Sequence, residues 1–262
     1  MRYAALASGS KGNCHALSEG GRTLLIDAGI SLAQVRARLS VCGLDAGSVG
    51  AVALTHEHSD HRAAVGVLVR NTPWAFLATR ETKLAVESCV GETIPASRWI
   101  ELRAGHPCDW DGWRVLPFSL PHDAVDPVAF RVEAAGCAAA VVTDLGHGTA
   151  LVADHCSDLD LLALEANHDV EMLRNGAYPD ALKARILSRV GHLSNAAMAE
   201  LLAKVLSPRL HTLVLAHLSE QNNHPDLARL AAEEILRGAA TALHLATQAQ
   251  PMAVEISLER AG

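Results

Sequence analysis

The most constraining feature of this sequence is a group of four possible metal ligands in the six residues from His56 to His61. From residue 55 the segment reads Thr-His-Glu-His-Ser-Asp-His, directly after an apolar run at 51–54 that predicts a buried strand. Imidazoles and carboxylates suit Zn²⁺, Mn²⁺ or Fe²⁺, and no cysteine lies nearby in the sequence. Alternation at 56, 58 and 60 directs these side chains to one side of an extended turn. One ion would not need all four groups, so the cluster predicts a site for two.

A polar loop in solvent is the alternative explanation of this segment. Burial of four such groups without a metal would be costly, and their exposure would leave the apolar strand before them unexplained. The spacing His-x-His-x-Asp-His after an apolar strand is specific, and we interpret it as a metal site.

Short apolar runs alternating with helix-like stretches predict an α/β fold. After a first strand at the N-terminus, we expect strands at 23–27, 51–55, 74–78, 113–118, 139–143, 160–165 and 212–216. We expect helices near 32–39, 61–69, 79–90, 180–190, 196–205 and 226–236. Asp180 after Pro179 and Asn195 after Ser194 are expected helix starts. Strands crowd the first half of the chain, which favours sheets packed on each other with helices outside.

Length and composition predict one domain that comprises residues 1–262. Half of the residues are hydrophobic, enough for one large core, and no repeat, low-complexity tract or linker divides the chain. The N-terminus lacks signal-peptide features and the apolar runs are too short to span a bilayer, so we expect a cytoplasmic protein without membrane association. The net charge of −7 argues against a uniformly basic coat for nucleic acid, although bound cations would offset part of it.

Polar residues stand where several predicted strands end. Each lies at the C-terminal end of an apolar run or just past it: Asp27, His56, Asp144, Glu165 and His217. Strand ends that project His and Asp side chains into one mouth are a rigid way to build a metal site.

Taken in order, these motifs resemble those of the metallo-β-lactamase superfamily, with His122 after Pro121 at its third ligand motif. The resemblance implies a four-layer αβ/βα sandwich that binds two divalent ions, Zn²⁺ or Mn²⁺, with Fe²⁺ as a further option. It implies that Asp144 is shared between the ions and that Asp27 supports a ligand from behind. The implied ligands are His56, His58 and His122 for one ion, and Asp60, His61 and His217 for the other.

The residues alone leave alternatives at each of these later positions. Asp27 could cap a turn, and Asp144 could cap a helix beyond residue 149. A lone histidine such as His122 in a loop is usually a surface residue. For His217 the competitor is His211, which begins a predicted strand rather than ending it.

Later motifs resemble the nuclease branch of the superfamily, in particular tRNase Z. They are Glu165 followed by alanine, His192 in Gly-His-Leu-Ser, and His217 in Leu-Ala-His-Leu-Ser. The resemblance implies a phosphodiesterase in which a metal-activated hydroxide attacks, Asp60 is essential, and His192, oriented by Glu165, donates a proton to the leaving oxygen. A buried polar pair that supports a loop is the alternative for Glu165 and His192.

The most extensive resemblance is to the YycJ/WalJ group of nucleases of this fold. It covers nearly the whole chain, from 7–14 through 121–127, 143–146, 167–169, 178–179 and 191–195 to 217–223. That group is described as DNA exonucleases acting from 5′ ends, so the resemblance implies a 5′ to 3′ DNA exonuclease. The sequence has no β-CASP-sized insertion between Asp144 and His217 and no long tRNase Z arm.

Two segments could contact a phosphate backbone. Residues 8–13 offer backbone N–H groups and polar side chains, as a phosphate cradle would, although a tight β-turn explains them equally well; the side chains are Ser8, Ser10, Lys11 and Asn13. Four basic residues before His192 could form a positive rim, but a solvated helix face is the better interpretation; they are Arg174, Lys183, Arg185 and Arg189. Aromatic residues are 3% of the chain, which predicts backbone recognition of DNA with little base stacking.

Two other functions remain open. A thioester or lactone hydrolase of the same fold would keep the metal site but would not explain His192 with Glu165. A non-catalytic metal-binding protein is the alternative of another class, against which the complete set of ligands argues.

Overall fold

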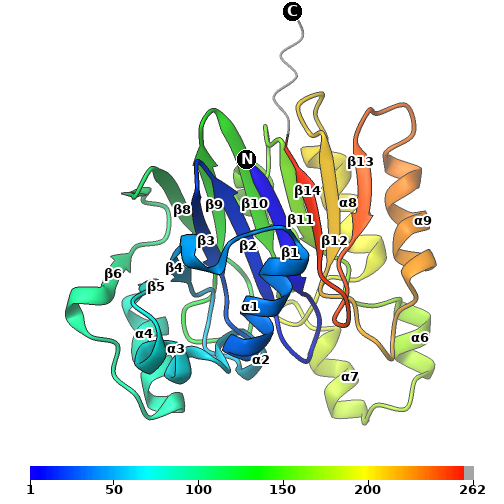
Figure 1. Ribbon diagram of the computed structural model, residues 1–262. Helices are drawn as coiled ribbons and strands as arrows, with labels where there is room; N and C mark the ends of the chain where they lie inside the picture. The colour runs from blue at the N-terminus through cyan, green and yellow to red at the C-terminus, as the bar shows by residue number, and fades with distance from the viewer. Residues whose placement is uncertain (257–262) are drawn as a thin grey trace, which may run out of the picture.

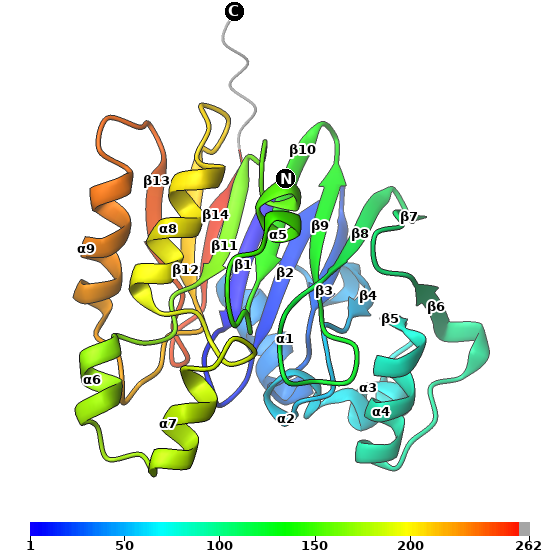
Figure 2. The same cartoon turned by 180° about the vertical axis from the view of Figure 1, so that it is seen from behind.

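The computed structural model describes residues 1–256 as two seven-stranded sheets packed face to face, with helices over the outer face of each (Figures 1 and 2). The first sheet has the order β14-β1-β2-β3-β4-β5-β6 and the second β13-β12-β11-β10-β9-β8-β7. This arrangement confirms the α/β sandwich that the sequence predicted. No helix in residues 1–256 has the length and apolar character needed to cross a membrane.

The first half of the chain builds most of the first sheet and its helices. The strands are β1 (Arg2–Ala7), β2 (Cys14–Glu19), β3 (Arg22–Ile26), β4 (Val49–Ala53), β5 (Ala75–Thr79), β6 (Trp99–Leu102) and, from the C-terminal part, β14 (Met252–Glu255). The helices are α1 (Leu32–Val41), α2 (Ser59–Arg62), α3 (Val65–Asn71) and α4 (Arg80–Val90), with short 3₁₀ turns at 46–48 and 96–98. Strand β14 pairs antiparallel with β1, so the first and last strands lie side by side.

The rest of the chain builds the second sheet. Its strands are β7 (Cys108–Trp110), β8 (Trp113–Ser119), β9 (Val128–Ala134), β10 (Cys137–Val142), β11 (Leu161–Glu165), β12 (Thr212–Ala216) and β13 (Ala242–Leu245). Its helices are α5 (Ala150–His155), α6 (Val170–Asn175), α7 (Asp180–Ile186), α8 (Asn195–Val205) and α9 (Pro225–Ile235). In Figure 2, α8 and α9 cover this sheet, whereas α6 and α7 lie beyond its lower edge.

Each sheet contains a block of parallel strands, and these blocks position the site. Strands β3 to β6 are parallel in the first sheet, and β10 to β13 in the second. Ligand sites in such sheets lie outside the carboxyl ends of the strands. The polar residues expected at strand ends follow or end parallel strands of both sheets, so they lie where this rule places a ligand site.

Apolar side chains alternate between the faces of each sheet and form three layers of core. Tyr3, Phe130 and Val214 lie fully buried between the sheets. Helices α1, α3 and α4 cover the outer face of the first sheet, and α8 and α9 that of the second, where Leu202 is fully buried. At about 25 cal/mol per Å² of buried apolar surface, these layers are the main stabilising contribution.

The predicted strands and helices are all present, with most bounds shifted by one or two residues and two larger changes. The helix expected at 61–69 is divided into α2 and α3, and α7 ends at Ile186 rather than near residue 190. The expected starts at Asp180 and Asn195 are confirmed; Ser194 caps α8 by accepting a hydrogen bond from the Ala197 N–H. Eight further elements were not among those predicted: β2, β6, β7, β9, β13, β14, α5 and α6.

Candidate metal centre

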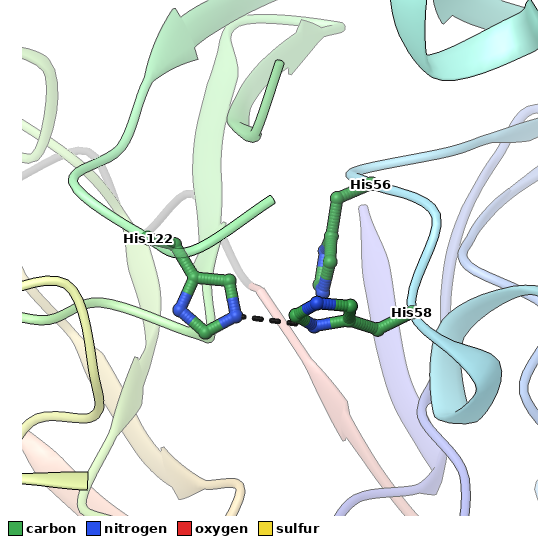
Figure 3. A group of neighbouring side chains, drawn as sticks. All are labelled: His56, His58 and His122. Atoms are coloured by element: carbon green, nitrogen blue, oxygen red, sulfur yellow. Dashed lines mark hydrogen bonds between the residues drawn. The ribbon is translucent and has the colours of Figure 1, made fainter. Parts of the chain in front are cut away.

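The seven predicted ligands come together where the carboxyl ends of parallel strands from the two sheets meet. His56, His58 and His122 offer ligand atoms within 4.8 Å of one another, and so do Asp60, His61 and His217. A third group, His56, His61 and Asp144, joins the first two because it shares a residue with each. Figure 3 shows His122 on one chain segment pointing toward His56 and His58 on the segment after β4.

Three of the residues that follow these strands have a left-handed backbone. Asp27 after β3, Asp144 after β10 and His217 after β12 have φ of 63°, 62° and 54°. This conformation is uncommon for residues other than glycine and costs of order 1–3 kcal/mol each. Three of the six non-glycine residues with a positive φ in the described residues therefore lie at the candidate site.

Asp27 and Thr55 hold the ligands contributed by the first sheet. The Asp27 carboxylate lies 2.7 Å from His61 Nδ1 and accepts hydrogen bonds from the N–H and hydroxyl of Thr55. The Thr55 hydroxyl in turn lies 2.9 Å from His56 Nδ1. Asp27 therefore contacts His61, as expected of a residue that supports a ligand. The supporting role of Thr55 was not predicted, although Thr55 directly precedes the first ligand, His56.

Glu165 holds the ligands contributed by the second sheet. Its Oε1 lies 2.8 Å from Nδ1 of both His192 and His217. Its Oε2 accepts hydrogen bonds from the N–H groups of Leu145 and Leu193, at 2.7 and 3.1 Å. Glu165 is fully buried, so this carboxylate is satisfied only through the groups that it positions.

The donor atoms fit bound metal ions. Nδ1 of His56, His61, His122 and His217 each lies within 3.0 Å of an oxygen: Thr55 Oγ1, Asp27 Oδ2, Gly191 O and Glu165 Oε1. These contacts fix the rings as supporting groups do in metal sites. Of the ten buried side-chain atoms without a hydrogen-bond partner within residues 1–256, three belong to predicted ligands: His56 Nε2, Asp144 Oδ2 and His217 Nε2. Buried polar atoms are rarely left unpaired, and metal ligation satisfies all three.

Electrostatics also favour cations at this centre. Burial alone would lower the pKa of His217, but Asp144, Asp60 and Glu165 raise it to about 10. Burial likewise opposes protonation of His61, yet Asp144, Asp27 and Asp60 raise its pKa well above the usual value. The negative carboxylates thus stabilise the protonated, cationic form of these histidines. A bound metal cation would neutralise the same negative charge.

The ligands open onto a cavity of about 280 Å³ whose lining residues are all polar or charged. It is formed by Ser10, His58, Ser59, Asp60, Asp144, Arg185, His192 and His217. Larger hollows elsewhere on the described surface contain none of the predicted ligands. We therefore take the smaller cavity as the reaction site, because it alone among them borders the convergent polar groups.

The predicted phosphate cradle at 8–13 is divided in the structure. The hydroxyl of Ser8 accepts a hydrogen bond from the N–H of His217, and Asn13 Nδ2 lies 3.2 Å from Asp60 Oδ2 and 3.1 Å from His61 Nε2. Both are buried and contact residues of the metal centre. Lys11 is exposed and paired with Glu220. Of the four side chains, Ser10 lines the cavity.

The structure also separates the alternatives that the sequence left open. Thr149, not Asp144, caps helix α5, because its hydroxyl accepts a hydrogen bond from the Val152 N–H. His211 belongs to none of the ligand groups, whereas His217 belongs to two. Of the four basic residues for which a solvated helix face was the better interpretation, Arg185 borders the cavity, and its side chain is also exposed.

Comparisons with known proteins agree with this geometry. Residues 22–218 match the model of the β-lactamase superfamily domain. The chain is 34% identical to the exodeoxyribonuclease YycJ of Bacillus anthracis over 236 residues, which are 90% of this chain and 89% of that protein. It is 36% identical to the exodeoxyribonuclease WalJ of Streptococcus pneumoniae over 232 residues, 88% of this chain and 86% of that one.

Solved structures share the fold. The Zn²⁺-bound PqqB of Methylobacterium extorquens has a TM-score of 0.75 at 18% identity, over 97% of this chain and 100% of that one. The short form of human tRNase Z has a TM-score of 0.67 at 18% identity, over 98% and 100% of the two chains. At these identities the likeness concerns the arrangement of strands and helices alone.

Proposed function

Because this chain belongs to the β-lactamase superfamily, and within it to the family of the YycJ and WalJ exodeoxyribonucleases, we propose that this metal-dependent hydrolase is a DNA exonuclease. We propose that it holds two divalent ions, Zn²⁺ or Mn²⁺, and degrades strands in the 5′ to 3′ direction. One ion is assigned to His56, His58 and His122, the other to Asp60, His61 and His217, with Asp144 shared. The grouping of Asp144 with His56 and His61 supports this assignment, because His56 belongs to the first ligand group and His61 to the second.

The observation that carries the proposal is the contact of His192 with Glu165 beside the cavity. His192, Glu165, Asp144 and His217 also lie close enough to be a ligand group, but Glu165 Oε1 is at hydrogen-bond distance, 2.8 Å, from both histidines. A hydrogen-bonded network is therefore the better interpretation of this group. His192 remains 21% exposed, whereas Glu165 is fully buried.

The residues suggest a division of labour in phosphodiester cleavage. Bound divalent ions would supply a low-pKa water and stabilise charge on phosphate oxygens. Glu165 holds Nδ1 of His192, which orients the ring so that Nε2–H can donate a proton to the leaving oxygen. Ser8 and Asn13 hold His217, Asp60 and His61 in place. When the P–O bond breaks, the leaving oxygen thus departs as a neutral hydroxyl group.

The lining of the cavity favours a phosphodiester over a thioester or lactone. Pockets for small molecules are predominantly apolar with a few polar groups, whereas all eight residues that line this cavity are polar or charged. An acyl chain would find no apolar residue among those that line the cavity. A phosphate group, in contrast, finds hydroxyl, imidazole and guanidinium donors.

Cleavage of end-labelled DNA tests this proposal. Single-stranded and duplex DNA labelled at either end would be incubated with purified protein loaded with Mn²⁺ or with Zn²⁺. We expect metal-dependent shortening from the 5′ end, abolished in Asp60→Ala, with circular dichroism showing that the variant remains folded. Inertness toward DNA together with turnover of a thioester would refute the proposed substrate and leave the metal site intact.

A further inference from the structure

The cavity has one basic side chain that the reaction described above does not use. Arg185 lies on helix α7 and is the one lysine or arginine among the residues that line the cavity. Its side chain is 53% exposed, so its donors reach solvent. The other three basic residues of the predicted rim, Arg174, Lys183 and Arg189, contribute nothing to this lining.

Asp123 holds the Arg185 guanidinium from one side. Asp123 Oδ2 accepts a hydrogen bond from Nε of Arg185, and Oδ1 accepts one from Nη2 at 3.1 Å. A guanidinium has five N–H donors in a planar fork. Two of them meet Asp123, which leaves three, including both on Nη1, for another acceptor. A carboxylate that fixes one edge of an arginine presents the remaining edge to a ligand at little cost in side-chain entropy.

The backbone around Arg185 is fixed to the metal centre. The N–H of His192 donates to Ile186 O at 3.0 Å, and His122 Nδ1 lies 3.0 Å from Gly191 O. A Cβ at Gly191 would lie 2.2 Å from Ile186 O and 2.3 Å from Arg185 O, so the two segments approach as closely as glycine allows. These contacts fix the position of the Arg185 backbone relative to His122 and His192.

From these contacts we propose that Arg185, oriented by Asp123, is the phosphate-binding residue of the cavity. It binds non-bridging oxygens of a nucleic-acid phosphate by bidentate hydrogen bonds, the geometry for which arginine is suited. Asp60 and Asp144 also line the cavity and would repel an anion, so Arg185 is the lining residue whose fixed positive charge can pair with a phosphate. The proposal rests on the nuclease function for its substrate, but its binding step can be measured separately.

Binding of thymidine 5′-monophosphate to the metal-loaded protein separates the two proposals. Calorimetry on Arg185→Gln is expected to show affinity reduced about 10- to 100-fold, the loss of charged hydrogen bonds, with metal content unchanged. Arg185→Lys keeps the charge but not the fork and is expected to recover only part of the affinity. Arg189→Gln removes the same charge from a residue outside the cavity lining and is the matched control. Equal losses in Arg185→Gln and Arg189→Gln, or none in either, would overturn the phosphate site even if DNA is cleaved.

Cleavage of DNA with a 5′-phosphate or a 5′-hydroxyl then identifies which phosphate Arg185 binds. Loss of a preference for the 5′-phosphate in Arg185→Gln assigns it to the terminal phosphate, whereas equal slowing on both substrates assigns it to an internal one. In either case the association constant for DNA should depend less steeply on salt in Arg185→Gln: the slope of its logarithm against the logarithm of salt concentration is expected to decrease in magnitude by about one. An unchanged slope with unchanged KM would contradict the proposal.

Discussion

The two sheets contribute to the metal centre in different ways. The first sheet supplies His56, His58, Asp60 and His61 from one short segment after β4. The second sheet supplies single residues from separate places: His122 between β8 and β9, Asp144 after β10, and His217 after β12. The first set is local in sequence, and the second exists only once parallel strands have brought their ends together.

The buried carboxylates behind the two sets also differ. Burial outweighs the attraction of His61 and raises the pKa of Asp27. For Glu165, burial would also raise the pKa, but His192 and His217 hold it at about 2. Asp27 contacts one predicted ligand, whereas Glu165 contacts a predicted ligand and the proposed proton donor. In the proposed mechanism the second set would therefore couple metal binding to proton transfer through Glu165, and the first set would not.

The largest effect is expected where the two sets meet, at Asp144. This carboxylate lies 3.1 Å from His61 Nε2 and 3.7 Å from His217 Nδ1. Asp144→Asn weakens both ion sites at once, so we expect at least about a 10³-fold loss of rate, as removal of several kcal/mol of transition-state stabilisation requires. Rate and metal content would be compared with Asp154→Asn, on the exposed face of α5. A variant that keeps both ions and nearly full activity would contradict the shared role.

The next effect tests the proton donor alone. His192→Ala is expected to slow DNA cleavage about 10²- to 10⁴-fold, the usual contribution of general acid catalysis. Metal content, measured by elemental analysis, should remain that of the unaltered protein. His147→Ala is the control because His147 is outside the cavity lining. Loss of metal from His192→Ala would instead make His192 a ligand and remove the distinction between the two sets.

The two supporting carboxylates are then compared directly. Asp27→Asn and Glu165→Gln are each expected to lower metal affinity about 10- to 100-fold, as loss of a group behind a ligand does. Excess metal should restore the activity of Asp27→Asn, because Asp27 contacts His61 and, through Thr55, His56, but not the proposed proton donor His192. It should not restore Glu165→Gln, in which His192 is released as well. Titration of activity with Mn²⁺ measures both, and equal recovery would abolish the contrast.

The same difference explains how far the sequence could predict the site. The segment 55–61 is specific because its ligands are neighbours in the chain, and the strand ends at Asp144 and His217 are visible as apolar runs that stop at a polar residue. The contacts of Asn13 with Asp60 and His61 join residues 47 and 48 positions apart. Such pairs depend on how the loops meet, which local patterns do not contain.

Arg185 and the edge strands show the same limit. In sequence Arg185 is one of four basic residues; its pair with Asp123 and the packing of α7 against Gly191 distinguish it from Arg189 only in the folded chain. Strands β13 and β14 are short and partly exposed, so their apolar periodicity is weak. They form because β12 and β1 offer unpaired edges, a condition set by the rest of the fold.

The smallest effect is expected at Thr55, whose hydroxyl supports a ligand of the first set, whereas the Glu165 carboxylate does so in the second. Its hydroxyl joins Asp27 to His56 within the buried site. Thr55→Val keeps the shape but leaves His56 Nδ1 without an acceptor, at a cost of about 1–3 kcal/mol. For a chain of this size, Tm should fall by about 2–4 °C per kcal/mol.

Thermal unfolding of the chelated protein measures this cost without the contribution of metal. Thr55→Ser retains the hydroxyl and should unfold near the original Tm. Thr143→Val is the matched change in the second sheet, because Thr143 is equally buried and precedes Asp144 as Thr55 precedes His56. We expect it to have the smaller effect, since Glu165 rather than a hydroxyl holds that set. Equal destabilisation by both valines would mean that the two sets are supported alike.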